Sequence, residues 1–338
     1  MAAVRAAIAL FAIAIAAGSV ASASAGQTLE GCRAHSLDGS VKVTFLGTTT
    51  LLLDDGQTQL LIDGFLSRPP LSTVVFGRVQ TNPTLVDGIL DRVFEHGRDQ
   101  RLKALFVTHS HYDHALDAAY IAERTGARLY GSRSTLNIGR GGGLCEAQLT
   151  RIRPNTTWYE GAFEVCVLAS RHSPPTLFNP IGGVVKAPLQ QPARYLDYAE
   201  ESTVDFLITH CGHRMLIKAS ANFAAAAPEA DVLFLSTSQL GRQSDEFMET
   251  FYAQTVAQAR PRLLVPLHWD DFFEPLTGHL RPAPWPIDKT HEAFDFLLAR
   301  VSEENQRRSF ADRLEFRLMQ GYDSVVLFKP GNPDGRPL

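Results

Sequence analysis

The chain has 338 residues, an apolar fraction of 45% and a formal net charge of −4. This is the composition of an ordinary globular protein, and the length supports a sizeable core in one large domain or two small ones. The mild acidity and the scattered Lys and Arg residues give no electrostatic footprint for nucleic acid, so we expect no such partner.

The N-terminus has the layout of a secretory signal peptide. Arg5 precedes an almost unbroken apolar run at 6–17, and a string of small residues ends in Ala23-Ser24-Ala25. This run is too short to span a bilayer, which favours a cleaved signal over a membrane anchor. We therefore predict a signal peptide over residues 1–25 and an exported chain, periplasmic or secreted, over residues 26–338. We expect no transmembrane span in that mature chain.

Four cysteines follow the predicted cleavage site, and none belongs to a C-x-x-C pair. An even number in an exported protein permits two disulfides, and four cysteines allow three connectivities. The residues are Cys32, Cys145, Cys166 and Cys211.

Strands and helices are expected in a regular order along the mature chain. The first part has apolar patterns that predict strands at 41–46, 48–53, 59–62, 105–108 and 128–130, and helices at 83–95 and 115–124. An Asp-Gly turn at 54–56 makes a hairpin of two of these strands, and Gly126 is placed to end the second helix.

The second part has patterns that predict strands at 163–169, 204–209, 214–218, 231–235, 263–266 and 324–328, and helices at 245–259 and 289–304. In each half, antiparallel hairpins come first and β-α alternation follows. That order predicts two sheets stacked face to face with helices outside, in a single domain.

The most informative segment is His-Ser-His-Tyr-Asp-His at residues 109–114. Its metal-capable side chains are those of His109, His111, Asp113 and His114. They lie on a predicted strand-to-helix loop, where a rigid scaffold aims side chains at one point. Imidazoles together with a carboxylate suit a borderline divalent ion such as zinc. A solvated histidine-rich loop is the alternative interpretation.

This pattern resembles the metallo-β-lactamase-fold hydrolases, whose hallmark is His-x-His-x-Asp-His after a strand. The resemblance covers about residues 41–330 and includes Phe45-Leu46-Gly47, Leu61-Ile62-Asp63-Gly64 and Val265-Pro266-Leu267-His268. These flanks are most similar to the branch with ascorbate-phosphate lactonases and N-acylphosphatidylethanolamine phospholipases D. The resemblance implies an α+β fold, a four-layer αββα sandwich of two mixed β-sheets flanked by helices.

The resemblance also implies two adjacent metal ions. Two residues of the motif and a histidine after a later strand would bind the first ion: His109, His111 and His172. The other two and a histidine after a still later strand would bind the second: Asp113, His114 and His268. We expect one or two Zn²⁺ ions, with Fe or Mn as alternatives.

One position departs from the family pattern. The family places an aspartate after the strand at 214–218, where its carboxylate bridges both metals, whereas this chain has Lys218-Ala219-Ser220-Ala221-Asn222. Asn222 is a candidate ligand through its neutral carbonyl oxygen. Without a carboxylate between two dications their charge is less well neutralised. The second ion would then be weak, absent or held differently.

The expected nucleophile is hydroxide, because a bound metal lowers the pKa of water from near 16 towards roughly 7. Asp113, the predicted catalytic residue, would orient that water as a ligand and proton acceptor. Asp63 would hydrogen-bond a ligand histidine and fix its tautomer. A turn-capping role is the alternative for Asp63.

Other polar residues support weaker hypotheses. His210 and His213 flank a predicted hairpin and are interpreted as exposed turn residues. Asp270 and Asp271 either line the mouth of a pocket or are solvated acids. The glycine-rich segment 139–143 would cradle an anion or is simply flexible.

Three functions remain open from the sequence. The first is a hydrolase acting on an ester, lactone, phosphodiester or amide, and the Pro-rich loop at 173–191 suits a small-molecule or lipid-like substrate. The second is a single-iron oxidoreductase on the same fold, and the third is a metal-binding protein without turnover. Metal identity and the effect of His111→Ala separate them, since zinc performs no redox chemistry.

Overall fold

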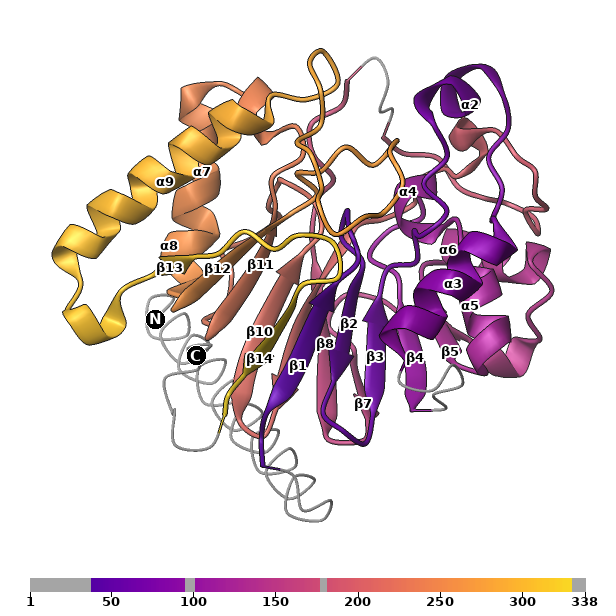
Figure 1. Ribbon diagram of the computed structural model, residues 1–338, viewed down its shortest axis with the longest axis horizontal. Helices are drawn as coiled ribbons and strands as arrows, with labels where there is room; N and C mark the ends of the chain where they lie inside the picture. The colour runs from indigo at the N-terminus through magenta and orange to yellow at the C-terminus, as the bar shows by residue number, and fades with distance from the viewer. Residues whose placement is uncertain (1–37, 95–100, 177–180, 330–338) are drawn as a thin grey trace, which may run out of the picture.

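The computed structural model describes residues 38–94, 101–176 and 181–329, so the predicted signal peptide and Cys32 lie outside the described residues. Within these ranges the chain forms two seven-stranded β-sheets packed face to face, with helices on the outer faces (Figure 1). The predicted αββα sandwich of two mixed sheets is confirmed.

The first sheet has the strand order β14-β1-β2-β3-β4-β5-β6. Its strands are β1 (Val41–Phe45), β2 (Leu51–Asp54), β3 (Gln59–Ile62), β4 (Leu102–Phe106), β5 (Arg128–Gly131), β6 (Leu149–Arg151) and β14 (Ser324–Leu327). Neighbours from β14 to β3 pair antiparallel, and those from β3 to β6 pair parallel. The predicted hairpin is present, with Leu51 opposite Ile62 and Asp54 opposite Gln59.

The second sheet repeats this scheme in the order β13-β12-β11-β10-β9-β8-β7. Its strands are β7 (Thr157–Glu160), β8 (Phe163–Ala169), β9 (Val204–His210), β10 (His213–Lys218), β11 (Val232–Ser236), β12 (Leu263–Leu267) and β13 (Glu315–Phe316). Strands β7 to β10 pair antiparallel and β10 to β13 pair parallel. The predicted order, hairpins first and β-α units after them, is confirmed in both halves.

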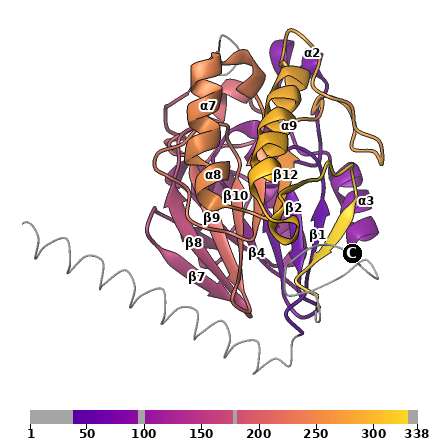
Figure 2. The ribbon, with the colours of Figure 1, turned by 90° about the vertical axis from the view of Figure 1, so that its left-hand side faces the viewer.

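Helices α3, α5 and α6 lie beside the first sheet, and α7, α8 and α9 lie on the outer face of the second (Figures 1 and 2). The α-helices are α2 (Leu71–Phe76), α3 (Pro83–Val93), α4 (Tyr112–Ala115), α5 (Ala118–Thr125), α6 (Arg133–Gly141), α7 (Asp245–Gln254), α8 (Val256–Ala259) and α9 (Thr290–Arg307). Short 3₁₀ turns are η1 (Glu146–Gln148), η2 (Tyr195–Asp197), η3 (Leu240–Arg242) and η4 (Phe310–Asp312). None of these described helices combines the length and hydropathy needed to span a bilayer.

The alternation of side chains along the strands divides the buried apolar residues into two clusters. In β10, Met215 and Ile217 face the core between the sheets, whereas Leu216 faces the layer beneath α7, α8 and α9. That outer layer includes Phe251 of α7 and Leu297 of α9, both fully buried. Burial of one such side chain contributes about 1.5–3 kcal/mol, so the sandwich is held mainly by these two layers.

Local signals fix several helix ends. The Asn82 side chain accepts a hydrogen bond from the amide of Leu85, and Pro83 opens α3, which is a favoured start for a helix. Helix α5 ends at Gly126 with φ 75°, as predicted from the sequence.

Some sequence expectations about helices are wrong. The helix expected at 115–124 is broken: α4 ends at Ala115, and α5 begins at Ala118. Asp113 and His114 lie within α4 and not on a loop. Helices α2 and α6 were not predicted from the sequence. The glycine-rich segment at 139–143 includes the last residues of α6, where Gly141 approaches the Leu189 backbone too closely for any side chain. This packing explains Gly141 without an anion.

The β9–β10 turn is more buried than expected. His210 has a fully buried side chain that faces the Asp55 carboxylate at 3.1 Å, so its interpretation as an exposed residue is wrong. His213 is half-buried and stacks on Phe328. Cys211, between them, is disulfide-bonded.

The remaining cysteines do not form a second disulfide. Cys145 and Cys166 are both free. The even cysteine count permits two disulfides, but Cys145 and Cys166 take part in neither.

A buried ion pair joins the two halves of the chain near the end of β12. The Arg68 and Asp270 side chains are both 0% exposed and lie 2.7 Å apart. Asp270 also accepts a hydrogen bond from the amide of Thr48, and Arg68 donates to the backbone oxygens of Asp271 and Glu274. The interpretation of Asp270 as a solvated or pocket-mouth acid is wrong, because its carboxylate is fully buried against Arg68 and does not line the cavity.

We expect Asp270→Asn to lower the free energy of unfolding by about 3–5 kcal/mol, because it leaves the Arg68 guanidinium buried without a counter-charge. The measurement is urea denaturation followed by circular dichroism. The matched control is Asp87→Asn, which removes a half-exposed partner of Arg124 and should cost less than about 1 kcal/mol. Equal losses for the two variants would contradict the assigned role of the buried pair.

Candidate metal centre

The predicted ligands meet where strands of both sheets end. The segment 109–114 follows β4 of the first sheet, whereas His172 follows β8 and His268 follows β12 of the second. Loops at strand ends are positioned by the rigid sheet beneath them. Each of two candidate ligand groups therefore combines residues from the first sheet with one from the second.

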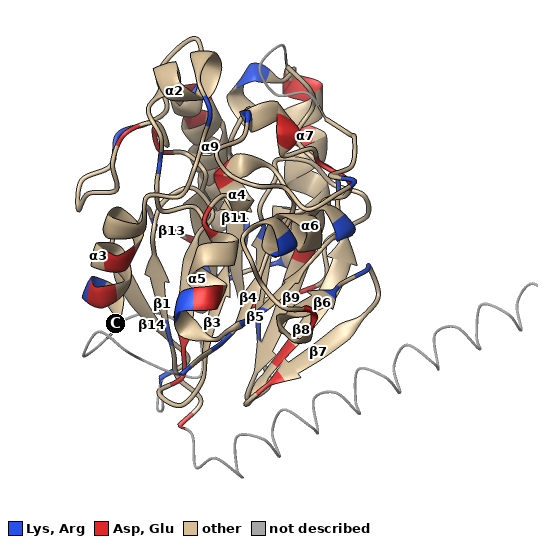
Figure 3. Ribbon diagram, turned by 90° about the vertical axis from the view of Figure 1, so that its right-hand side faces the viewer, with Lys and Arg blue, Asp and Glu red and all other residues tan. Residues whose placement is uncertain are grey.

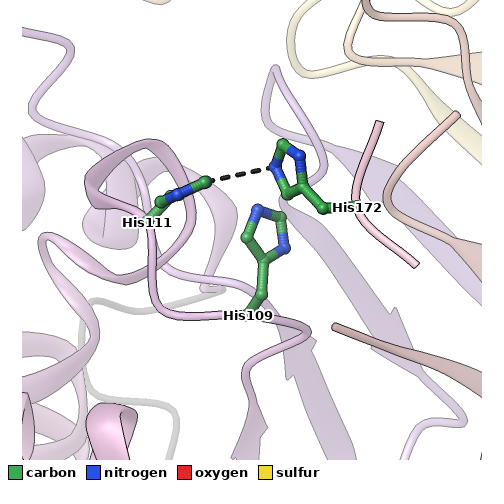
Figure 4. A group of neighbouring side chains, drawn as sticks. All are labelled: His109, His111 and His172. Atoms are coloured by element: carbon green, nitrogen blue, oxygen red, sulfur yellow. Dashed lines mark hydrogen bonds between the residues drawn. The ribbon is translucent and has the colours of Figure 1, made fainter. Parts of the chain in front are cut away.

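The first group consists of His109, His111 and His172, whose ligand atoms all lie within 4.8 Å of one another. Figure 4 shows the three rings turned towards a common point. The Nδ1 atom of His111 faces the Nε2 atom of His172 at 3.1 Å. The other ring nitrogen of His172, Nδ1, forms a hydrogen bond with the carbonyl oxygen of Ser173 at 3.0 Å. When neutral, it therefore turns an Nε2 lone pair towards the group.

The environment keeps these imidazoles neutral. Burial, and then the neighbouring His114, holds the pKa of His109 well below its usual value. Burial, and then the neighbouring His111, lowers the pKa of His172 to about 3. Neutral imidazole is the form that binds metal, so both rings are in a ligand form at neutral pH.

The second group consists of Asp113, His114 and His268, and its ligand atoms also lie within 4.8 Å of one another. The Asp113 carboxylate lies 3.2 Å from Nε2 of His268 and 3.8 Å from Nε2 of His114. The ring centroids of His109 and His114 are only 3.8 Å apart, so the two groups are neighbours.

The charges in the second group favour an ionised carboxylate. Burial would raise the pKa of Asp113, but the adjacent His114 and His268 outweigh it and hold this pKa well below its ordinary value. Burial lowers the pKa of His114, but the carboxylates of Asp63 and Asp113 outweigh that effect and raise it. Asp113 is therefore an anionic ligand candidate over the whole physiological pH range.

Asp63 supports His114 from behind. Its carboxylate lies 2.8 Å from Nδ1 of His114, which leaves Nε2 of that ring facing the ligand group. The same carboxylate accepts hydrogen bonds from the Thr49 hydroxyl at 2.5 Å and the Thr108 amide at 2.8 Å. Asp63 thus occupies the position expected of a residue that fixes a ligand tautomer. The sequence interpretation missed the two threonines, although Thr49 lies in an unusual Thr-Thr-Thr run.

The donor set fits a divalent metal ion. Nε2 of His109 and Nδ1 of His268 are buried and have no hydrogen-bond partner among the described residues. An unpaired buried polar atom is costly, and a metal ion or its bound water would satisfy such atoms. Five imidazoles and one carboxylate are ligands that zinc, iron and manganese accept.

Asn222 hydrogen-bonds the backbone beside the first ligand group. Its side-chain NH₂ donates to the carbonyl oxygen of His172 at 2.7 Å, and its Oδ1 accepts from the amide of Phe223. The amide thus supports His172 from behind, and its role as a metal ligand stays a prediction. Ala219 and Ser220 line the site cavity instead, so β10 is followed there by no carboxylate.

Five of the six candidate ligands, all except the more deeply buried His109, line a cavity of about 450 Å³. The cavity is bounded mostly by apolar and aromatic side chains, among them Leu71, Val74, Tyr112, Tyr195, Phe272, Phe273, Trp285 and Ile287. Arg242 adds a cation to this lining. Walls of this kind exclude water and leave the ligand groups as the main polar surface.

Comparisons with known proteins agree with this geometry. Residues 84–211 match the model of the metallo-beta-lactamase superfamily. The chain carries a metallo-beta-lactamase superfamily domain. The matched residues include the segment 109–114 and His172, so the resemblance noted in the sequence is confirmed at the superfamily level.

Two curated relatives are both named UPF0173 metal-dependent hydrolase. The protein from Christiangramia forsetii is 36% identical over 87 residues, which are 26% of this chain and 30% of the relative. The protein from Heliobacterium modesticaldum is 34% identical over 90 residues, 27% of this chain and 29% of the relative. The match thus spans less than a third of these relatives.

Among solved structures, the metallo hydrolase Igni18 from Ignicoccus hospitalis is similar to this chain. The identity is 15% and the TM-score is 0.49, over 85% of this chain and 98% of that one.

We expect Asp63→Asn to weaken metal binding about 10–100-fold, because His114 loses the carboxylate that orients it. The measurement is competition with a chromophoric chelator. The matched control is Asp55→Asn, which alters the other buried Asp–His pair, formed with His210 in the β9–β10 turn. Unchanged affinity in Asp63→Asn, or an equal loss in the control, would contradict this role.

Proposed function

We propose that the protein is a metal-dependent hydrolase that acts through a metal-activated water on an ester, lactone, phosphodiester or amide. The observation that carries this proposal is the pair of adjacent ligand groups within one apolar cavity. The superfamily match and the names of the curated relatives support it. The substrate is a small molecule or a lipid-like molecule with hydrophobic surface, in keeping with the cavity walls.

When bound, the metal ion would lower the pKa of its water and polarise the bond under attack. One or two Zn²⁺ ions are proposed, with Fe or Mn as alternatives. His109, His111 and His172 would hold one ion, and Asp113, His114 and His268 would hold the other.

The protein side chains have separate roles in this chemistry. Asp113 is ionised and lies beside His268 and His114 in the second ligand group, so it would orient the attacking water and accept its proton. Asp63 keeps the His114 ring in one orientation through a 2.8 Å contact. The apolar walls limit access of bulk water, which strengthens electrostatic interactions inside the cavity.

The missing carboxylate after β10 bears on metal occupancy. Two neighbouring dications would share only one ligand carboxylate, that of Asp113. The buried acid on β9, Asp205, is already paired with Lys218 at 2.5 Å. We therefore propose that one ion is held firmly and that a second, where present, is released first by a chelator.

The test combines metal analysis with hydrolysis assays on protein purified from an exporting host without chelator. We expect one to two equivalents of metal, with hydrolysis of model esters or phosphodiesters that is lost on chelation and restored by zinc. His111→Ala should lower kcat/KM by more than about a hundredfold, beyond the typical loss from a supporting residue.

The matched control is His213→Ala, because His213 stacks on Phe328 and is not a ligand candidate. Redox-active iron without hydrolysis would replace the hydrolase with an oxidoreductase. Bound metal with neither activity would indicate a binding protein.

We further propose that the chain is exported and cleaved after Ala25. The support is the apolar run and the small residues of the N-terminus, which lie outside the described residues. N-terminal sequencing of protein from the periplasm or medium of an exporting host should begin at Gly26. Ala25→Arg should block cleavage, because the site requires small residues. An intact N-terminus in the unaltered, exported chain would contradict the proposed cleavage.

A further inference from the structure

The turn between β1 and β2 contacts both histidines of the second ligand group. The hydroxyl of Thr49 lies 2.9 Å from Nδ1 of His114, which follows the first sheet. The carbonyl oxygen of Thr48 accepts a hydrogen bond from the amide of His268 at 2.6 Å, and His268 follows the second sheet. One turn therefore holds two candidate ligands that come from different sheets.

The buried ion pair described above holds this turn from its other side. The amide of Thr48 donates to Oδ1 of Asp270 at 2.9 Å. The second oxygen of the same carboxylate, Oδ2, lies 2.7 Å from Nη2 of Arg68. Asp270 thus has one oxygen on the turn and one on the guanidinium, and Thr48 passes the contact on to His268.

Gly47 gives the guanidinium its space. A Cβ atom at position 47 would lie 2.1 Å from Nη1 of Arg68 and 3.2 Å from Oδ2 of Asp270, so a side chain there would displace the pair. The φ angle of Gly47 is 83°, a conformation that glycine adopts without strain. The four residues Gly47, Thr48, Arg68 and Asp270 are named here the Arg68 clamp.

Two residues of this contact network have strained backbone conformations. Thr48 has φ 54° and His268 has φ 55°. This left-handed region is uncommon for residues other than glycine, and a β-branched residue is an outlier there. Such conformations persist only where the surrounding contacts fix them. Loss of the Asp270 carboxylate would therefore let Thr48 and His268 relax, and the His268 ring would leave its place in the ligand group.

Arg68 also fixes the segment that follows His268. Its Nη2 donates to the carbonyl oxygen of Asp271 at 2.7 Å, and its Nε donates to that of Glu274 at 2.6 Å. Phe272, between these two residues, packs edge-on against the His268 ring with a centroid distance of 5.2 Å. The backbone and the ring of His268 are thus both held through contacts of Arg68.

The burial of this pair points to a role beyond stability. Figure 3 shows acidic and basic residues on the outer helices α3 and α5, where Asp87 and Arg124 form a part-exposed pair. The Arg68 and Asp270 side chains are instead 0% exposed. Apolar residues in place of a buried ion pair are often equally stable, so stability alone does not account for it. Accurate placement of a ligand does.

We propose that Arg68 and Asp270 are positioning residues for the metal ion of the second ligand group, acting through Thr48 on His268. The first group takes its residue of the second sheet, His172, from the end of β8, which three strands separate from β12. The clamp should therefore act on one group only. The proposal shares with the proposed function the requirement that metal binds, but it requires no turnover.

The test compares the affinity for Co²⁺ in two backgrounds. His172→Ala leaves only the second group complete, and His268→Ala leaves only the first. Co²⁺ is the probe because its visible bands report the geometry of its ligands, whereas zinc has a filled d shell. Affinity is measured by competition with a chromophoric chelator.

We expect Asp270→Ala to weaken Co²⁺ binding about 10–100-fold in the His172→Ala background, with a changed visible spectrum, because His268 is no longer held in place. In the His268→Ala background the same substitution should change the affinity less than about twofold, since the first group does not depend on the clamp. Circular dichroism establishes that each variant is folded.

Leu297→Ala is the control for lost stability. Leu297 is fully buried beneath α9, in the outer hydrophobic layer, so its truncation leaves a cavity and destabilises the fold without removing a contact of the clamp. Its effect on Co²⁺ affinity should be the same in both backgrounds.

Arg68→Lys decides the matter if Asp270→Ala does not fold. Lysine keeps a positive charge for Asp270 but lacks the planar fork of donors that reaches the carbonyl oxygens of Asp271 and Glu274. It should weaken Co²⁺ binding in the His172→Ala background only.

The outcomes separate positioning from stability and from catalysis. Equal losses in the two backgrounds, or a loss no greater than that of Leu297→Ala, would reduce the clamp to a stabilising pair and overturn the proposal. Full affinity in a folded clamp variant would overturn it too, as would a His172→Ala background that binds no Co²⁺. Hydrolysis of a model ester by the unaltered chain is measured in parallel. If that hydrolysis is missing while the clamp effect is present, the hydrolase function fails and the positioning role stands.

Discussion

The buried carboxylate of Asp63 is the interaction on which the metal centre depends. It is 0% exposed and receives hydrogen bonds from Thr49 and Thr108 while it holds His114. A buried carboxylate that loses its partners is strongly destabilising, so the ends of β3 and β4 and the turn before β2 must keep their relative positions. The same requirement aims the His114 ring at the ligand group. Fold and site are thus governed by one constraint.

Much of this could be predicted from local sequence. The alternation around the first strands and the six-residue segment 109–114 need no distant partner to be recognised. His172 and His268 could be found because each follows an apolar run that ends at the same edge of the sandwich. The sequence left two roles open for Asp63, support of a ligand histidine or capping of a turn. The structure places its carboxylate beside His114. Ser220 at the cavity wall shows that the expected carboxylate is missing in space as well as in sequence.

The rest depended on contacts between residues remote in sequence. Asp55 and His210 are 155 positions apart, and Arg68 and Asp270 are 202 apart, so no local pattern identifies either pair. A polar residue whose partner is far away in the sequence is expected to be exposed. This is why His210 and Asp270 were both wrongly interpreted. Helix α2 was missed for a different reason, because Leu-Ser-Thr-Val-Val-Phe contains β-branched residues with low helix propensity.

Each ligand group takes two residues from the first sheet and one from the second. An ion held by such a group would be a cross-link between the sheets. Its binding free energy would count towards folding, because ligands split between the sheets are together only in the folded chain. At a free ion concentration a hundred times the Kd this linkage is worth about 2.7 kcal/mol. The metal would then stabilise the contact between the two sheets. Cys145 and Cys166 do not contribute to this contact through a disulfide, because both are free.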